Sequence, residues 1–333
     1  MQNEIQKLGE LIHNSHKILL INHIRMDGDA WGSLGGLALI LKSLGKEVVG
    51  INDCPVPPFL DFLGNTEIVQ AELDVEAYNP DLIISLDAAD EDRLGNIYKK
   101  YKKYFQTKTL VVIDHHISNP AFGNLNIIDT KASSVCEMMV QIIVELGLES
   151  HVSPEVATFF YTGLQTDTNM YFTNNTRKET LLAGAKLIEL GADFRLPIEK
   201  CFKSRSIIEI ELWKIALRNL KQNDAQTFSY SSISVDDLRS ITGINKEDIG
   251  GYLKGFINDV LINIEGTKIA FLLYPLGLSE NKVSMRSQSG YDVNAICQTF
   301  GGGGHLQASG FQSIDSQEEI IQKLLKITSN ILD

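Results

Sequence analysis

The chain has 333 residues, of which 44% are hydrophobic and 22% charged, a composition typical of a globular protein with room for two domains. Its formal net charge of −12 disfavours binding of long duplex nucleic acid, which depends on lysine and arginine. No apolar run approaches the length of a membrane span, and the polar N-terminal segment lacks the apolar core of a signal peptide. We therefore expect a protein that is not held in a membrane.

The four cysteines are scattered along the chain and include no Cys-x-x-Cys pair. They are Cys54, Cys136, Cys201 and Cys297. This spacing indicates neither a disulfide framework nor a zinc–thiolate site. We expect buried thiols in a reducing compartment, and therefore a cytoplasmic protein.

Short β-rich runs alternate with helical patterns through the first half of the chain. The expected strands are residues 17–22, 47–52, 82–86, 110–113 and 126–129. Some of these runs are apolar throughout, as expected when helices cover both faces of a parallel sheet. Helices are predicted over residues 30–45, after Ser134 with a capping box to Glu137, and after Ser153 with Pro154 in the first turn. The pattern predicts an α/β fold with a Rossmann-like, five-stranded parallel sheet and flanking helices.

A long amphipathic stretch over residues 195–222 predicts a packed connecting helix rather than a flexible linker. The segments after it predict strands at 227–234, 268–276 and 282–288, and helices at 244–262 and 292–300. We therefore expect three parts. They are a first domain over residues 1–194, the connecting helix over 195–222, and a smaller α/β domain with a mixed sheet over 223–333.

Polar side chains gather where the expected strands of the first half end. They are His23, Asp27, Asp29, Asp87, Asp114, His115 and His116, and Asp167 follows the segment FFYTGLQT. The carboxyl ends of parallel strands form the edge at which α/β sheets bind ligands. One aspartate after a strand is commonly a helix cap or a turn residue. Four segments that bring acid or imidazole to one edge instead indicate a functional site.

Mixed imidazole and carboxylate ligands suit Mn²⁺, Fe²⁺, Co²⁺ or Zn²⁺, whereas oxygen-only sites favour Mg²⁺ or Ca²⁺. Five carboxylates and three imidazoles exceed the needs of one ion. Two ions that share a bridging carboxylate use the set economically, and such pairs promote in-line displacement at phosphorus by an activated water. The first half therefore predicts a two-metal phosphoesterase.

Four consecutive glycines, residues 301–304, follow the last expected helix and end in His305. A glycine run alone is most often a flexible loop. Successive glycines also let backbone N–H groups approach an anion closely, and the guanidinium of Arg286 in the same domain suits phosphate oxygens. Together these features favour a phosphate or nucleotide platform.

The motifs HIRMDGDAWGS, LDAAD, DHH and GLQTDT occur in this order, and with them the sequence resembles the DHH phosphoesterase family. The segment SMRSQSGYDVNAICQTFGGGGHLQASG resembles the DHH-associated C-terminal domain. Within the family, the chain is most similar to bacterial enzymes that hydrolyse short oligoribonucleotides and dephosphorylate 3′-phosphoadenosine 5′-phosphate (pAp). The resemblance implies two divalent ions, expected to be Mn²⁺, and short oligonucleotides, linear dinucleotides and pAp as substrates.

The resemblance also implies a role for each motif residue. One metal would be held by His23, Asp27 and Asp87, and a second by Asp29, Asp87, His115 and Asp167, with Asp87 as the bridge. His116 would face the scissile phosphate, and Asp114 would orient His115. The rest of the substrate would be bound by Arg286, Ser287, Gly303, Gly304 and His305.

Three other functions compete with this interpretation. An inorganic pyrophosphatase can share the metal-binding half, but the GGGGH segment counts against it. A single-strand exonuclease would normally carry a further nucleic-acid-binding domain. A non-catalytic nucleotide-binding regulator would be expected to have lost acidic ligands. The sequence leaves open the preferred substrate, the direction of cleavage, RNA against DNA, and the oligomeric state, a homodimer included.

Overall fold

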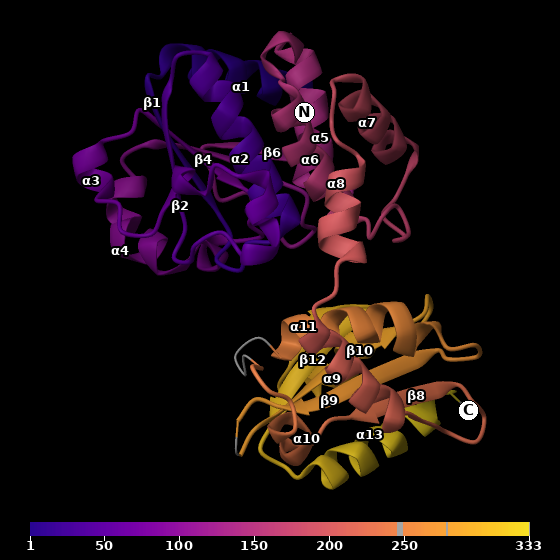
Figure 1. The fold of residues 1–333 in the computed structure, drawn as a ribbon. Coiled ribbons are helices and arrows are strands. Elements are labelled where there is room, and N and C mark those ends of the chain that lie inside the picture. Colours follow the sequence, from indigo (N-terminus) through magenta and orange to yellow (C-terminus); the bar gives the residue numbers. More distant parts are fainter. Residues whose placement is uncertain (245–248, 278, 333) are drawn as a thin grey trace. The chain divides into compact units, whose positions relative to one another are not determined.

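The computed structural model describes residues 1–244, 249–277 and 279–332, and the chain divides into two units, Met1–Ser204 and Arg205–Asp333 (Figure 1). Each unit contains a six-stranded sheet of its own. The expected fold class, a parallel α/β sheet followed by a smaller α/β part with a mixed sheet, is confirmed. None of the helices in the described ranges is long and apolar enough to cross a membrane.

The sheet of the first unit is parallel throughout, with the strand order β3-β2-β1-β4-β5-β6. Its strands are β1 (Lys17–Asn22), β2 (Glu47–Ile51), β3 (Val69–Gln70), β4 (Leu82–Leu86), β5 (Thr109–Asp114) and β6 (Leu125–Ile128). All five expected strands are present, each end within one residue of its expected position. The additional strand, β3, has only two residues, too few to carry a periodic pattern.

Helices cover both faces of this sheet. They are α1 (Gln2–Asn14), α2 (Gly28–Ser43), α3 (Val75–Tyr78), α4 (Gly95–Phe105), α5 (Val135–Glu145) and α6 (Pro154–Asp167), and a further helix, α7 (Lys178–Glu189), packs on α5 and α6. Alternate residues of each strand point to opposite faces. Ile18 and Leu20 of β1 therefore join a core with α1, α2, α5 and α6, whereas Leu19 and Ile21 join a second core with α3 and α4.

The strand order places the ends of β1 and β4 side by side. From β1 the chain builds outward through β2 and β3, then returns to start the other half of the sheet at β4. Such a reversal leaves a crevice beyond the carboxyl ends of the two central strands, where open α/β sheets bind ligands. His23 follows β1 and Asp87 follows β4, so both lie at this crevice.

Glycines bring α2 and α6 into close contact. A Cβ atom on Gly35 would lie 2.3 Å from Phe159 Cε1, and one on Gly32 would lie 2.6 Å from the carbonyl oxygen of Phe159. At Gly163 of α6, a Cβ atom would lie 2.8 Å from Asp29 Oδ1. The absence of side chains at these positions therefore lets the first turn of α2, which carries Asp29, pack directly on α6.

The sheet of the second unit is mixed, with the order β11-β12-β10-β9-β8-β7 and one parallel pair, β8 with β9. Its strands are β7 (Lys221–Gln222), β8 (Phe228–Ser232), β9 (Ile269–Pro275), β10 (Asn281–Ser287), β11 (Gly303–His305) and β12 (Ala308–Ser313). Its α-helices are α9 (Ile207–Arg218), α10 (Val235–Arg239), α11 (Ile249–Gly255), α12 (Val293–Gln298) and α13 (Gln317–Leu332). Of the expected helix over 244–262, residues 245–248 lie outside the described residues, and α11 continues into the π-helix η7 (Phe256–Val260) and the short 3-10 helix η8 (Leu261–Asn263).

The stretch expected to form one connecting helix, residues 195–222, is interrupted. A short helix, α8 (Arg195–Pro197), runs into the π-helix η5 (Ile198–Lys203), and α9 begins only at Ile207. The Ser206 hydroxyl caps α9 by accepting a hydrogen bond from the backbone N–H of Glu209. A capping serine starts a new helix because its side chain satisfies a free N–H group, which accounts for the break. Leu212 and Ile215 of α9 then pack into the core of the second unit.

The glycine run is partly an edge strand. Gly303 and Gly304 belong to β11 and pair with Gly310 and Ser309 of β12. A Cβ atom on Gly302 would lie 2.3 Å from the carbonyl oxygen of Gly310, so that position requires glycine for close packing. The run is therefore not a free linker.

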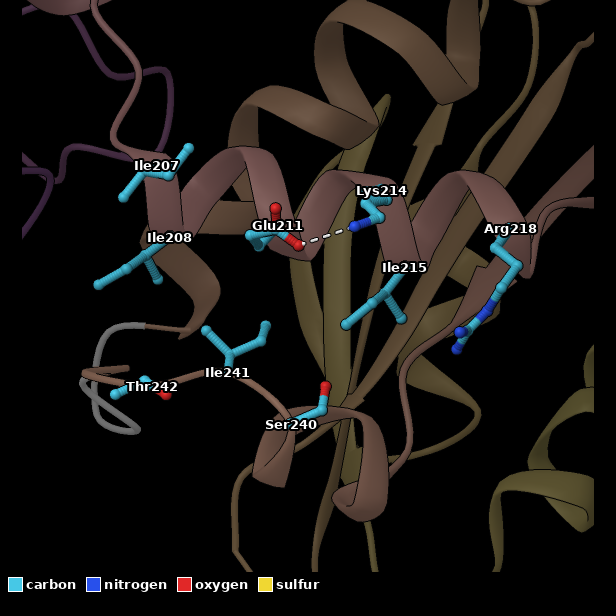
Figure 2. Close-up of a pocket in the computed structure, with 9 residues that line it drawn as sticks. All are labelled: Ile207, Ile208, Glu211, Lys214, Ile215, Arg218, Ser240, Ile241 and Thr242. Atoms are coloured by element: carbon cyan, nitrogen blue, oxygen red, sulfur yellow. Dashed lines mark hydrogen bonds and ion pairs between the residues drawn. The ribbon is translucent and has the colours of Figure 1, made fainter.

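A groove of about 430 Å³ lies elsewhere in the second unit, between α9 and the segment after α10 (Figure 2). Ile207, Ile208, Ile215 and Ile241 give it an apolar floor, and Glu211 and Lys214 pair beside it at 3.2 Å. Among the described residues that line it, none is a predicted site residue.

Candidate metal centre

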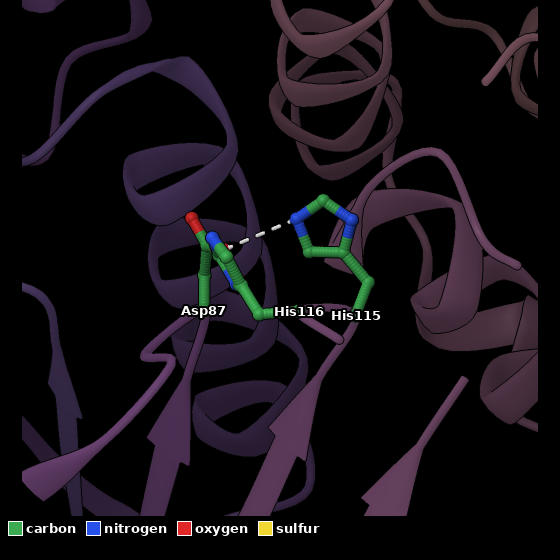
Figure 3. Close-up of side chains that lie close together, drawn as sticks. All are labelled: Asp87, His115 and His116. Atoms are coloured by element: carbon green, nitrogen blue, oxygen red, sulfur yellow. Dashed lines mark ion pairs between the residues drawn. The ribbon is translucent and has the colours of Figure 1, made fainter. Parts of the chain in front are cut away.

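The eight polar residues singled out in the first half converge at the crevice of the parallel sheet. Strand ends supply His23, Asp87, Asp114, His115 and His116, the first turn of α2 and its cap supply Asp29 and Asp27, and the end of α6 supplies Asp167. Figure 3 shows Asp87 beside the imidazoles of His115 and His116 at the ends of β4 and β5. The close packing of α2 on α6 adds the remaining carboxylates.

Three overlapping groups of three side chains have the geometry of metal sites, with ligand atoms that all lie within 4.8 Å of one another. They are His23, Asp27 and Asp87, which we call the first set; Asp29, His115 and Asp167, which we call the second set; and Asp87, His115 and His116. His23 Nε2 lies 3.6 Å from Asp27 Oδ1, and His115 Nε2 lies 3.6 Å from Asp167 Oδ2.

Asp87 lies between the two sets. Its Oδ2 atom is 3.4 Å from His23 Nε2, and its Oδ1 atom is 3.5 Å from His115 Nε2. The backbone of Asp87 is left-handed, with a φ of 54°, and its N–H donates to the carbonyl oxygen of Ile113 at 3.1 Å. A residue other than glycine in this region carries strain of about 1–3 kcal/mol, which functional sites often store. The turn thus directs one carboxylate toward both histidines.

The two aspartates of α2 are fixed by backbone donors. Asp27 caps α2, accepting hydrogen bonds at Oδ1 from the N–H groups of Asp29 and Ala30, both at 3.1 Å. Asp27 is therefore a helix cap, which is the common role of an aspartate after a strand, and it also contacts His23. Asp29 is fully buried and accepts from the N–H groups of Val135 at 2.6 Å and Cys136 at 2.8 Å, the first residues of α5.

The protonation equilibria of the site are strongly displaced. Burial alone would lower the pKa of His23 and of His115, but the neighbouring carboxylates outweigh it and raise these pKa values to about 10 and about 11. Burial, helped by the charge of Asp87, raises the pKa of Asp29 to about 7. Burial and the charge of Asp29 likewise raise the pKa of Asp167 well above its ordinary range. A cluster of this kind is short of positive charge.

The residues fit a divalent metal. Asp87 Oδ1 and His23 Nδ1 are buried and make no hydrogen bond with any residue in the described ranges. Buried polar atoms in proteins are nearly always satisfied, so an orphaned carboxylate oxygen among imidazoles points to a cation. The nitrogen and oxygen donors suit first-row transition metals better than Mg²⁺ or Ca²⁺.

The structure corrects the expected role of Asp114. Its Oδ1 atom accepts a hydrogen bond from Nδ1 of His116 at 2.8 Å, whereas Nδ1 of His115 lies 3.3 Å from the carbonyl oxygen of Ala132. Asp114 therefore orients His116 and not His115. Sequence reasoning missed Asn119, whose side-chain amide donates to Asp114 Oδ2 at 2.6 Å, because no motif marks it.

The predicted substrate residues of the second unit share one part of its sheet. Arg286 of β10 pairs with Ala308 of β12, which in turn pairs with His305 of β11. Directly paired residues of antiparallel strands project to the same face, so Arg286 and His305 flank Ala308 in one row. The guanidinium of Arg286 donates from Nε to Asn258 Oδ1 at 2.7 Å. The hydroxyl of Ser287, by contrast, donates to the carbonyl oxygen of Tyr291 within the fold.

Comparison with known proteins defines the class of this chain. Residues 17–164 match the DHH family, N-terminal domain, and residues 239–332 match the DHHA1 domain. The expectations of a DHH domain followed by a DHH-associated domain and of a hydrolase of phosphoester bonds are confirmed.

Particular relatives cover most of the chain. The bifunctional oligoribonuclease and PAP phosphatase NrnA of Thermus thermophilus is 29% identical over 297 residues, which span 88% of this chain and 83% of the relative. The protein of the same name from Bacillus subtilis is 27% identical over 316 residues, 92% of this chain and 93% of that one. The crystal structure of an exopolyphosphatase-related protein from Bacteroides fragilis is 25% identical, with a TM-score of 0.84 over 98% of this chain and 95% of its own.

Proposed function

We propose that the protein hydrolyses short oligoribonucleotides, including linear dinucleotides, to 5′-mononucleotides and converts pAp to AMP and phosphate. The position of Asp87, with one carboxylate oxygen toward each metal set, carries the proposal. A shared carboxylate is the arrangement that two-metal phosphoesterases require. Relatives named for both activities cover most of the chain and support this choice of substrates.

Two divalent metal ions, for which we propose Mn²⁺, would be held by the two sets with Asp87 in common. Bound there, the ions would supply an activated water and positive charge at the phosphoryl oxygens. The chain's own contribution is to hold the ligands in place. The strained turn fixes Asp87, α2 carries Asp27 and Asp29, and the end of α6 carries Asp167.

His116 is proposed to act on the reacting phosphate. The hydrogen bond to Asp114 places a proton on Nδ1 and leaves Nε2 for the substrate. In its imidazolium form, with a proton on Nε2 as well, His116 would donate a hydrogen bond to a phosphoryl oxygen as negative charge develops. Asp114 in turn is held by Asn119, so the imidazole is positioned before the substrate arrives.

The second unit is proposed to bind the parts of the substrate remote from the reacting phosphorus. The row formed by Arg286 and His305, beside the backbone of Gly303 and Gly304, offers a guanidinium and peptide N–H groups to phosphate. Ser287 would act through the backbone here, because its hydroxyl is engaged with Tyr291. The four free cysteines support a reducing compartment, and we place the protein in the cytoplasm.

The test is a parallel assay of Mn²⁺-loaded protein with pAp, a ribodinucleotide and pyrophosphate, following the release of AMP, mononucleotide and phosphate. We expect turnover of the first two substrates. An Asp87→Asn variant, which removes the charge but keeps a residue that tolerates the left-handed turn, should fall below about 1% of the wild-type rate. Its circular dichroism should match that of the wild type. Turnover of pyrophosphate alone would contradict the proposal, and so would an active Asp87→Asn variant.

A further inference from the structure

The network around Glu137 and Arg177 reaches the metal centre through the backbone. We propose that this ion pair, which we call the clamp, sets the metal affinity of the second set (Asp29, His115 and Asp167) and leaves that of the first set unchanged. The inference rests on the proposed two-metal function. Neither residue of the clamp is itself a ligand, so both act as positioning residues.

One short segment, residues 129–136, orients two of the three side chains in the second set. The carbonyl oxygen of Ala132 lies 3.3 Å from Nδ1 of His115 and leaves Nε2 of that ring directed at Asp87 and Asp167. The N–H groups of Val135 and Cys136 hold the two oxygens of Asp29 at 2.6 and 2.8 Å. The location of this segment therefore decides where two ligands lie.

Glu137 holds this segment in place through hydrogen bonds. The side chain is 5% exposed, and Oε2 accepts hydrogen bonds from the N–H of Ser133 at 3.0 Å, the hydroxyl of Ser133 at 2.7 Å and the hydroxyl of Thr180 at 2.7 Å. The expected capping box is thus altered, because the Glu137 carboxylate reaches Ser133 and not the N–H of the cap residue Ser134. Buried carboxylates in proteins are usually paired with a cation.

Arg177, at the start of α7, supplies that cation and ties the two ends of the segment together. Its Nη2 atom lies 2.6 Å from Glu137 Oε1 and 3.2 Å from Asp129 Oδ2, and its Nε atom donates to Glu137 Oε1 at 3.2 Å. Asp129 begins the segment and Glu137 follows its last residue. Removal of the guanidinium would leave a buried anion without its cationic partner and remove the link between the two ends.

The first set is built from other elements. Asp27 is fixed as the cap of α2, and the backbone of His23 accepts a hydrogen bond from the side-chain amide of Asn52 at 2.8 Å. Asp87 is fixed by its contact with the backbone of Ile113. A weakened clamp should therefore act on one metal-binding step, whereas a general loss of stability would act on both.

The experiment titrates chelator-treated protein with Mn²⁺ by isothermal titration calorimetry. Steps are assigned with Asp27→Asn for the first set and Asp167→Asn for the second. In Arg177→Met, which removes the charge and keeps an aliphatic chain, we expect the second-set step to weaken about 10–100-fold and the first-set step to stay within error. Arg177→Lys should restore most of the affinity. The matched control is Lys186→Met, which removes an exposed pair with Glu189 from the same helix and should change neither step.

Equal weakening of both steps, or no weakening in folded Arg177→Met, would overturn the inference. Should that variant fail to fold by circular dichroism, Glu137→Gln takes its place and must weaken the same step. Failure of the proposed function looks different: wild-type protein would bind fewer than two Mn²⁺ ions, or Asp87→Asn would bind them as the wild type does.

Discussion

His115 and His116 are adjacent in the chain, yet different groups hold their rings. The ring centroids are 4.6 Å apart and the planes cross at 64°, so the two imidazoles point in different directions. A backbone carbonyl holds His115 among the carboxylates, whereas the carboxylate of Asp114 holds His116. Both arrangements are found behind metal-bound histidines, and the second also suits a group that acts on the substrate.

An Asp114→Asn variant tests this division. Asparagine keeps an oxygen near Nδ1 of His116 but removes the negative charge, so the imidazole loses its anionic partner. We expect the rate of pAp hydrolysis to fall by about 10²-fold, a typical value for a general acid–base or oriented donor group. Mn²⁺ binding should be unchanged in calorimetry. Loss of a metal-binding step would show that Asp114 or His116 is itself needed to hold an ion.

The convergence of these polar residues could be predicted from the sequence because strand ends share one edge of a parallel sheet, whatever the lengths of the intervening segments. Their hydrogen-bond partners could not. Asp114 lies one residue from His115 and two from His116, and only the side-chain conformations decide which it contacts. Asn119 and Arg177 lie in segments where no periodic pattern fixes the backbone, so nothing in the sequence reveals their contacts.

At the level of elements, the packing of α2 on α6 determines whether the second set exists. Asp29 is in the first turn of α2, and Asp167 is the last residue of α6. The chain then turns at Asn169, Met170 and Tyr171, all with positive φ between 45° and 66°, before it reaches Arg177. The same end of the α2–α6 pair thus carries both carboxylates, and the chain continues from there to Arg177 of the clamp.

Gly163→Ala should disturb this contact. The new Cβ atom would lie 2.8 Å from Asp29 Oδ1 and 2.9 Å from the Cα atom of Asp29, so α2 must shift. We expect the free energy of unfolding to fall by about 1–3 kcal/mol, as for other overpacked cores, and Mn²⁺ affinity to fall with it. Urea denaturation measures the first effect and calorimetry the second. Gly277→Ala, at a site with nothing within 4 Å, should be neutral in both.

The break in the connecting stretch was harder to anticipate than the strands of the parallel sheet. Residues 195–222 have an amphipathic pattern throughout, and the pattern does not reveal that Ser206 caps a new helix or that α9 belongs to the second core. Strand boundaries were easier because each buried apolar run of the parallel sheet ends abruptly at a polar residue.

At the level of the whole molecule, the metal centre concentrates negative charge in a chain whose net charge is already −12. The sign of its effect on stability follows from the displaced pKa values. Asp29 takes up a proton at about pH 7 in the folded state but near its ordinary value of 3.8 when unfolded, so stability is lost as the pH rises from about 4 to about 7. The pKa of His23 is raised from 6.5 to about 10, so the stability that its proton contributes is lost as the pH rises from about 6.5 to about 10.

We therefore expect the metal-free protein to become less stable between pH 6 and about pH 9, and Mn²⁺ to remove most of that decline. The measurement is the thermal unfolding of chelator-treated protein across this pH range, with and without added Mn²⁺. His23→Gln should flatten the metal-free curve. A melting temperature that rises with pH in the absence of metal would contradict the expected sign.

Each unit is one uninterrupted stretch of sequence, and the chain passes from Met1–Ser204 to Arg205–Asp333 once. The proposed metal ligands all precede that crossing, and the residues proposed to hold the remainder of the substrate all follow it. A single recombination event near residue 204 could therefore give this metal centre a different C-terminal partner without touching any ligand. Such exchanges offer a simple evolutionary route by which one hydrolytic centre comes to serve several phosphorylated compounds.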